Sequence, residues 1–208
     1  MSKRVINYGI VILAGILVGS CGQTGSKNME TSKTASDNSL EGVTFSVEKS
    51  KVLWSGTSVG VYTHTGTVDF TDLDIQLKDG QLSGGSFTVD LTSIAATDEN
   101  YNPEEGHTRE KLIGHLSSPD FFDVENFPTA SFVINSVSGN SATGILTIRG
   151  ISHEETVNNI AVSKEEGAIK VTGDLVFNRK DYDVAWDYPA KDMLLKKEID
   201  LKIKLIGA

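Results

Sequence analysis

Cysteine is almost absent from this 208-residue sequence, which contains only Cys21. One thiol excludes an intrachain disulfide framework, and it excludes the cysteine-rich sites that hold zinc or iron–sulfur clusters. Basic residues are also few, because 19 lysines and arginines stand against 28 aspartates and glutamates and give a formal net charge of −9. A nucleic-acid-binding protein needs a concentrated positive surface, so this charge balance argues against such a partner.

The residue spacings that mark several enzyme classes are also missing. The four histidines form neither an HExxH pair nor a facial triad, so we expect no metal site; they are His64, His107, His115 and His153. No Gly-x-Ser-x-Gly elbow occurs. Four acids around one loop lack the spacing of a calcium loop and are interpreted as solvated: Asp98, Glu99, Glu104 and Glu105. We therefore expect a protein without catalytic residues.

Proline is rare, with 4 residues, whereas the 20 glycines suit a chain with many turns. Apolar and polar side chains alternate over residues 86–91, 169–177 and 199–205, as in strands with one buried face. Turn sequences at 78–80, 138–140 and 164–167 predict antiparallel hairpins. The apolar phase shifts within residues 68–77, which predicts a β-bulge. About eight or nine strands in a single domain favour an all-β barrel or sandwich.

One connection breaks this pattern. Residues 104–116 carry apolar side chains at helical spacing, which predicts a short helix in a long connecting loop. Phe121, Phe122 and Phe127 follow it, and such an aromatic cluster must be buried, for which the end of a barrel is the available place. Two compatible interpretations remain: a plug that completes the core, or a lid over a ligand cavity, for which Phe121 and Phe122 are the candidates.

The first twenty residues have the pattern of a secretory signal. Lys3 and Arg4 precede an apolar run over residues 10–18, which is shorter than the about 20 residues that a spanning helix needs. The sequence LVGSC at 17–21 resembles a bacterial lipobox. Residues 1–20 are thus predicted to be a lipoprotein signal peptide, and Cys21 the lipid anchor. An ordinary signal peptide and a short uncleaved anchor are the alternatives.

Residues 21–42 predict a lipidated N-terminus followed by a flexible tether, because they are rich in Ser, Thr, Gly and Asn. Removal of residues 1–20 takes away two positive charges and no acid, so the formal charge would change from −9 to −11. Anionic lipid repels an acidic domain, so acyl chains must hold it at the membrane. Gly22, rather than an aspartate, follows the cysteine. We therefore predict a lipid-anchored protein of the bacterial cell envelope, at the outer membrane and facing the periplasm.

Six segments carry a resemblance to a known family: KVLWSG (51–56), HTG (64–66), LSGGSFTVDLTSI (82–94), HLSSPDFFDVENFPTASF (115–132), GILTIRGISH (144–153) and NRKDY (178–182). In this order they resemble the YceI-like family of secreted polyisoprenoid-binding proteins, and the similarity covers residues 43–208. The resemblance implies an all-β fold, an antiparallel eight-stranded lipocalin-like β-barrel. It also implies a homodimer.

The resemblance further implies that a polyisoprenoid, an isoprenoid quinone or a similar lipid binds inside the barrel, with no other cofactor. Each buried methylene contributes about 0.8 kcal/mol to the binding free energy, so an apolar cavity with one opening is enough to bind such a chain. The candidates for the apolar lining, each also compatible with ordinary core packing, are Trp54, Phe87, Phe132, Leu146 and Phe177. The alternative function is that of a structural or partner-binding envelope lipoprotein with a filled barrel and no ligand.

Two arginines are candidates to bind a ligand headgroup, Arg149 and Arg179, because arginine suits bidentate contact with phosphate. A salt bridge to a nearby acid, such as Asp181 or Glu154, is the alternative role. Three glycines on predicted strands either leave room for a ligand or allow a close crossing of the chain, and we favour the crossing: Gly84, Gly144 and Gly173.

Overall fold

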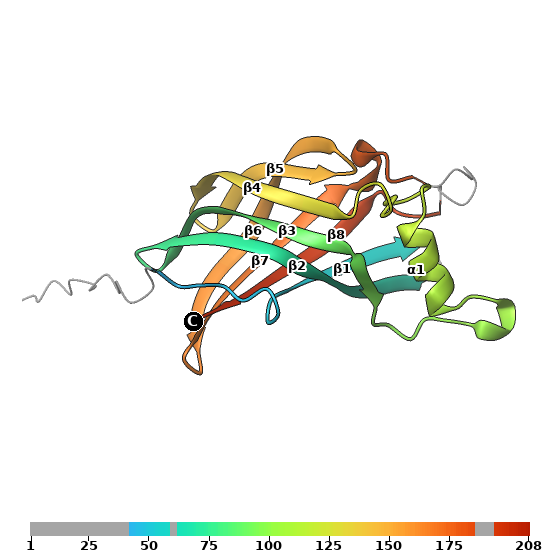
Figure 1. The fold of residues 1–208 in the computed structure, drawn as a ribbon, viewed down its shortest axis with the longest axis horizontal. Coiled ribbons are helices and arrows are strands. Elements are labelled where there is room, and N and C mark those ends of the chain that lie inside the picture. Colours follow the sequence, from blue (N-terminus) through green and yellow to red (C-terminus); the bar gives the residue numbers. More distant parts are fainter. Residues whose placement is uncertain (1–41, 59–61, 186–193) are drawn as a thin grey trace, which may run out of the picture. The chain divides into compact units, whose positions relative to one another are not determined.

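Antiparallel strands close into a barrel in which each strand pairs with its neighbours in the sequence and the last pairs with the first (Figure 1). The structure is a computed structural model, and it describes residues 42–58, 62–185 and 194–208. In this part of the chain the strands are β1 (Lys51–Ser58), β2 (Tyr62–Lys78), β3 (Gln81–Ala96), β4 (Thr129–Ser138), β5 (Ser141–Ile148), β6 (Ile151–Glu165), β7 (Ala168–Asn178) and β8 (Glu198–Gly207). The predicted eight-stranded, lipocalin-like barrel is confirmed.

Tight turns with left-handed backbone join several of the strands. Asp79 and Gly80 have φ values of 50° and 74° between β2 and β3, and Glu166 and Gly167 have φ values of 50° and 86° between β6 and β7. Two successive positive φ values match the twist of the flanking strands, which favours two-residue hairpins. The hairpin turns predicted near residues 78–80, 138–140 and 164–167 are confirmed by the pairing of the strands on either side.

The β2–β3 pair is bulged where the sequence pattern changes phase. Its register shifts between Thr67 and Asp69, again between Phe70 and Asp72, and once more between Gln76 and Leu77. A bulge bends the strand and increases its twist, as closure of a barrel requires. The bulge predicted within residues 68–77 is therefore confirmed, and it lets two long strands curve around the interior.

An α-helix, α1 (Arg109–Ser117), lies in the β3–β4 connection, at one end of the barrel (Figure 1). It begins later than predicted, because the chain first forms a 3-10 turn, η2 (Pro103–Glu105), which ends at Gly106 with a φ of 75°. Thr108 then caps α1 by accepting a hydrogen bond from the backbone N–H of Lys111. The helix predicted over 104–116 was wrong in its first turn. In the described segments no helix has the length and apolarity to cross a bilayer.

Connections in a barrel of this topology alternate between its two ends. The strand ends that the β1–β2, β3–β4, β5–β6 and β7–β8 connections join therefore lie at the end that carries α1, which we call the α1 end. Farther from α1, about midway along β3, an aromatic stack crosses the interior. The ring of Phe87 lies 5.5 Å from that of Phe132 in a stacked arrangement and 5.6 Å from that of Phe70 in an edge-on one.

Two strand glycines are positions of close approach. A Cβ at Gly144 would lie 2.3 Å from the carbonyl oxygen of Val133 and 2.7 Å from the ring of Phe132, and one at Gly173 would lie 2.6 Å from a methyl carbon of Val157. Neighbouring atoms thus occupy the space beside both glycines. At both positions the glycine allows a close crossing of the chain, and neither leaves room for a ligand.

The packing around Gly144 predicts that Gly144→Ala destabilises the barrel. The added methyl group would overlap Val133 and Phe132, and overpacking of this kind lowers the free energy of unfolding by about 1–3 kcal/mol. Gly84→Ala is the matched control, because its nearest neighbour would be 3.5 Å away, and it should leave stability unchanged or raise it by up to about 1 kcal/mol. Urea unfolding of both variants measures this. Equal free energies of unfolding for the two variants would contradict the steric crowding at Gly144.

Candidate functional site

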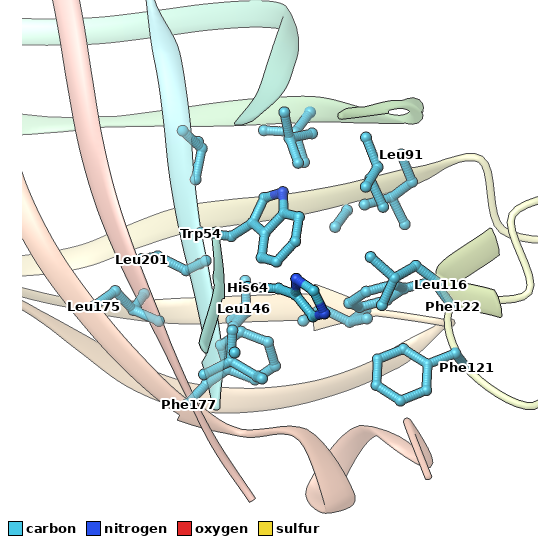
Figure 2. A pocket seen from close by; sticks show the side chains of 18 of the residues that line it. Trp54, His64, Leu91, Leu116, Phe121, Phe122, Leu146, Leu175, Phe177 and Leu201 are labelled. Atoms are coloured by element: carbon cyan, nitrogen blue, oxygen red, sulfur yellow. The ribbon is translucent and has the colours of Figure 1, made fainter. Parts of the chain in front are cut away.

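A cavity of about 210 Å³ lies inside the barrel at the α1 end (Figure 2). Inward-facing side chains of β1–β5, β7 and β8 form its wall, together with α1 and the segment that follows it. It is larger than an engineered apolar cavity of about 150 Å³ that binds benzene, and smaller than the roughly 300 Å³ at which drug-sized pockets begin. The space therefore suits a short stretch of hydrocarbon.

Four of the five predicted lining residues are on the wall of this cavity: Trp54, Phe87, Leu146 and Phe177. Phe132 is elsewhere, fully buried and bordering a second cavity of about 30 Å³. Phe87 and Ile203 line both cavities, so they form the partition between them. Phe132 is absent from the wall of the larger cavity because its ring stacks on the far side of Phe87, which separates it from that cavity.

Phe121 and Phe122 also line the cavity, at the α1 end, as Figure 2 shows. Their rings meet edge-on with centroids 5.4 Å apart, and Phe121 lies 5.1 Å from the ring of His115 on α1. Leu112 and Leu116 complete this part of the wall. The helix and the phenylalanines thus cover the hollow end of the barrel, which is the position expected of a plug or a lid.

The two arginines proposed for a headgroup hold the backbone instead. Arg179, at the start of η3 (Arg179–Tyr182), is fully buried, and its guanidinium donates to three carbonyl oxygens at 2.8–3.2 Å, those of Val184, Leu195 and Lys196. Arg149, in the β5–β6 turn with a φ of 51°, donates to the carbonyl oxygen of Phe121 at 2.8 Å and to that of Asp183.

Neither arginine belongs to the wall of the larger cavity among the described residues. The placement of Arg149 and Arg179 therefore departs from the headgroup prediction, and no salt bridge to an acid replaces it in the described contacts of Arg149. The physical reason is that irregular connections leave carbonyl groups without strand partners, and a guanidinium with five donors satisfies several of them at once.

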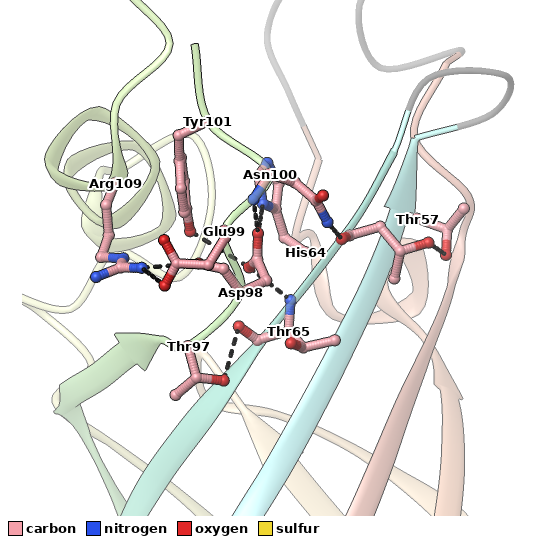
Figure 3. Close-up of polar contacts among 10 residues, drawn as sticks. Thr57, His64, Thr65, Thr97, Asp98, Glu99, Asn100, Tyr101 and Arg109 are labelled. Atoms are coloured by element: carbon pink, nitrogen blue, oxygen red, sulfur yellow. Dashed lines mark hydrogen bonds and ion pairs between the residues drawn. The ribbon is translucent and has the colours of Figure 1, made fainter. Parts of the chain in front are cut away.

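A polar network beside the cavity was missed by sequence reasoning (Figure 3). His64, near the start of β2, lines the cavity, and its Nδ1 lies 3.0 Å from Oδ1 of Asp98. The side chains of His64 and Asp98 are only 14% and 9% exposed. The interpretation of Asp98 as a solvated loop acid was wrong. It accepts further hydrogen bonds from the backbone N–H groups of Thr65 and Asn100 and from the hydroxyl of Tyr101.

These contacts keep Asp98 ionised. Burial alone would raise the pKa of Asp98, but the hydrogen bonds from the N–H groups of Thr65 and Asn100, and then from His64, outweigh it and hold that pKa below its usual value. A carboxylate can only accept, so Nδ1 of His64 must donate to it. In the neutral imidazole Nε2 is then left as an acceptor.

Arg109 ties the same network to the helix. Its guanidinium donates to the carbonyl oxygen of Asp98 at 2.7 Å and to the carboxylate of Glu99 at 3.1 Å, and it lies over the ring of Tyr101, 5.2 Å from the ring centre. The ring of Tyr101 in turn stacks on that of His64, with centroids 5.2 Å apart. Since Arg109 is the first residue of α1, the network fixes the helix against β2.

No group of three or more metal-ligating side chains occurs in the described segments. Cys21, the predicted signal peptide over 1–20 and all but the last residue of the predicted tether over 21–42 lie outside the described residues. Residue 42 itself starts the described chain.

A family model of the YceI-like domain matches residues 43–206. A UPF0312 protein of Staphylococcus epidermidis is 34% identical over 122 residues, which are 55% of this chain and 67% of that protein. A UPF0312 protein of Staphylococcus aureus is 33% identical over 102 residues, 46% of this chain and 59% of that protein. This chain thus spans about three fifths of the second relative.

Solved structures share the barrel. The crystal structure of BcnA from Burkholderia cenocepacia has a TM-score of 0.63 and 21% identity, covering 79% of this chain and 100% of that one. A polyisoprenoid binding domain from Saccharophagus degradans has a TM-score of 0.54 and 12% identity, covering 80% and 98%. The YCEI protein of Campylobacter jejuni has a TM-score of 0.51 and 20% identity, covering 68% and 84%. At these identities the likeness shows a common fold.

The network around Asp98 predicts an acid-dependent stability. The pKa of Asp98 is lowered on folding, so the stabilisation is present above the unfolded value of about 3.9 and is lost as the pH falls through the folded pKa. Asp98→Asn should therefore be less stable than the parent at pH 7, and this deficit should shrink at pH values below about 4.

Urea unfolding across this pH range measures the difference. Glu104→Gln is the control, because Glu104 is exposed on the same connection, and its difference from the parent should not depend on pH in this way. A deficit for Asp98→Asn that is the same at pH 7 and at pH 3 would contradict the assignment.

Proposed function

Because the chain belongs to the YceI-like family, we propose that it binds a long-chain amphiphile, a polyisoprenoid or a lipid of similar shape, with the apolar chain inside the barrel. The observation that carries this proposal is the cavity at the α1 end, since none of the described residues on its wall is a lysine, arginine, aspartate or glutamate. The description of the Saccharophagus degradans domain as polyisoprenoid binding supports the same class of ligand.

Burial of methylene groups supplies the energy of binding. Each buried methylene contributes about 0.8 kcal/mol, so two prenyl units of about ten carbons contribute roughly 8 kcal/mol before the cost of ordering the ligand. Such an interaction corresponds to a dissociation constant in the micromolar range or weaker. The aromatic partition of Phe87 limits the depth of the space, so the cavity holds one end of a long chain.

We further propose that Cys21 is acylated and anchors the protein to the outer membrane on the periplasmic side, with residues 21–42 as the tether. An anchor on a flexible tether keeps the binding domain close to a membrane and raises the effective concentration of lipids there. The role that follows is to sequester or carry an envelope lipid without a chemical change to it. The hollow end of the barrel argues against the alternative of a filled structural barrel.

The proposed site predicts that Leu201→Trp abolishes binding. Leu201 points into the cavity from β8, so a larger ring would occupy the space of the ligand. Leu53→Trp is the matched control, because Leu53 lies on the adjacent strand, is 42% exposed and is not on the cavity wall. Organic extraction of protein purified from its native source, followed by mass spectrometry, should yield a stoichiometric lipid from the parent and from Leu53→Trp.

The same extraction from Leu201→Trp should yield at least about tenfold less lipid, while its thermal unfolding shows that it is folded. A parent protein without bound lipid, together with no binding of added long-chain lipids, would contradict the proposed function.

The partition predicts that Phe87→Ala accepts a longer buried chain. Removal of this ring joins the cavities of about 210 Å³ and 30 Å³ and adds the volume of the ring itself. In a series of alkanols of increasing length, affinity for the parent should stop rising once the cavity is full. For Phe87→Ala it should continue to rise over several more methylenes, each worth up to about fourfold in affinity. If the affinities of the parent and of Phe87→Ala stop rising at the same alkanol length, Phe87 does not limit the depth of the cavity.

A further inference from the structure

Most of the cavity wall is closed to solvent. Among the residues described on this wall, Tyr62 is exposed, at 37%, and the others are buried or half-buried. The strands of the wall are hydrogen-bonded to a neighbour on each side, so separating them would break many hydrogen bonds. The part of the wall that moves at the lowest cost is therefore the cover, by which we mean α1 and the turn after it, residues 109–124.

Phe121 is the most deeply buried side chain of the cover. It is 3% exposed, and its ring lies on the cavity wall beside that of Phe122, as Figure 2 shows. The helix itself has no buried residue. Four backbone N–H groups after it donate to carbonyl oxygens of residues 116–118, within the cover; they are those of Phe121, Phe122, Asp123 and Val124. Segments with few buried apolar contacts open locally at a low free energy, so the contacts of Phe121 decide how readily the cover opens.

Arg149 holds the backbone of Phe121 from another connection. Arg149 and Gly150 form the β5–β6 turn, with φ values of 51° and 74°. An arginine seldom adopts left-handed backbone, and such residues persist where surrounding contacts offset the cost. Nη1 of Arg149 donates to the carbonyl oxygen of Phe121 at 2.8 Å and to that of Asp183. One guanidinium therefore joins three connections, those between β3 and β4, between β5 and β6, and between β7 and β8.

Arg179 holds the ring of the same phenylalanine. Its guanidinium carbon lies 5.9 Å from the centre of the Phe121 ring, within the range of a cation–π attraction. The side chain is fully buried and donates to carbonyl oxygens at two places in the β7–β8 connection, Val184 and Leu195. Leu195 is itself on the cavity wall. Arg179 therefore fixes the surface against which the ring of Phe121 lies.

We infer that Arg149 and Arg179 are positioning residues that hold the cover closed, and that Arg149 sets the rate at which a ligand enters and leaves the cavity. This inference rests on the proposed function and adds to it the step that controls exchange. Neither arginine is among the described wall residues, so both act on the cover and not on the bound chain. Covers of this kind often limit the rate at which a binding site exchanges its ligand.

The position of Arg149 predicts a change in rate without a change in affinity. Its hydrogen bonds lie outside the cavity, so they hold the cover whether or not a ligand is inside. Their loss makes opening easier in both cases and raises the association and dissociation rate constants by the same factor. The dissociation constant is the ratio of the two and stays the same. Because a guanidinium is always protonated, this hold on the cover does not depend on pH.

Stopped-flow fluorescence of the full-length protein, after removal of bound lipid, measures both rate constants. The probe is undecanol with a terminal bromine atom, which quenches the fluorescence of Trp54 on the cavity wall. Arg149→Met keeps the length of the side chain and removes its donors. It should raise both rate constants at least about tenfold, the usual effect of losing a hydrogen bond to a charged group, and leave the dissociation constant within about threefold.

Lys170→Met is the matched control, because the same change there removes a cation that pairs with Glu165 at 3.3 Å, at the β6–β7 turn. Its rate constants should equal those of the parent. Gly144→Ala is the second control, since it crowds Val133 and Phe132 and leaves the cover intact. It should lower the free energy of unfolding and keep both rate constants within about twofold. Equally fast exchange in Gly144→Ala and in Arg149→Met would overturn the inference, because loss of stability alone would then explain it.

Hydrogen exchange tests the hold on the cover without any ligand. In Arg149→Met the backbone N–H groups of residues 121–124 should exchange at least about tenfold faster, while those of β7 and β8 exchange as in the parent. Arg149→Lys keeps a charged donor and should exchange more slowly than Arg149→Met at these positions. It replaces Arg149→Met in the kinetic experiment if that variant does not fold, and a smaller rise in both rate constants is then expected.

The outcomes separate the inference from the proposed function. If the probe binds neither the parent nor any variant, the proposed function fails, and hydrogen exchange still decides whether Arg149 holds the cover. If the probe binds and Arg149→Met leaves both rate constants unchanged, the inference is overturned while apolar-chain binding stands. A weaker affinity at an unchanged association rate also overturns it, because Arg149 would then act only on the bound state.

Discussion

The interior width of an eight-stranded barrel is the constraint on which the site depends. Eight strands enclose a space that side chains can just fill, so the size of the inward-facing residues decides whether a given level is solid or hollow. Here the rings of Phe70, Phe87 and Phe132 fill the interior partway along the barrel, between the two cavities. Toward α1 the wall includes Gly56 and Ala130, whose small side chains leave space between the larger rings, and the cavity results. One layer of aromatic residues thus sets both the core and the depth of the pocket.

The hollow end also depends on polar contacts that close it from outside. A helix with no fully buried residue and little hydrophobic surface gains little stability from its own packing. Arg109 connects α1 to the backbone of Asp98 and to Tyr101, and Asp98 connects this group to His64 and Thr65 on β2. Asp98 therefore has two roles, because its backbone carbonyl group holds Arg109 of α1 and its carboxylate accepts the hydrogen bond from Nδ1 of the histidine that lines the cavity.

Periodic features were predictable from the sequence, and long-range polar partners were not. The alternation in β7 and β8, the hairpin turns and the bulge in β2 depend on neighbouring residues, so their pattern is local. His64 and Asp98 are 34 positions apart, and no local pattern pairs them. They come together because the start of β2 lies beside the end of β3 at the α1 end, which an up-and-down topology implies once the strands are assigned.

The contacts of the two arginines and of Phe132 could not be predicted for a related reason. Residue type indicates what a side chain can do, since an arginine can bind a phosphate or three carbonyl groups equally well. Which role it takes depends on how many backbone groups the neighbouring loops leave unpaired. An apolar residue on a strand likewise indicates burial, which Phe132 has, but it does not tell on which side of Phe87 the ring lies.

Charge acts on the ligand at two distances, and both effects have the same sign. The chain as a whole has a formal charge of −9, which repels anions over about the Debye length of 8 Å at physiological ionic strength. Inside, the wall offers no described cation, and desolvation adds a second penalty that salt does not screen. An uncharged amphiphile would meet neither barrier, and the end of its chain that enters the cavity would be buried. A binding site of this kind needs no attractive charge to be selective, since it excludes the competing lipids that carry one.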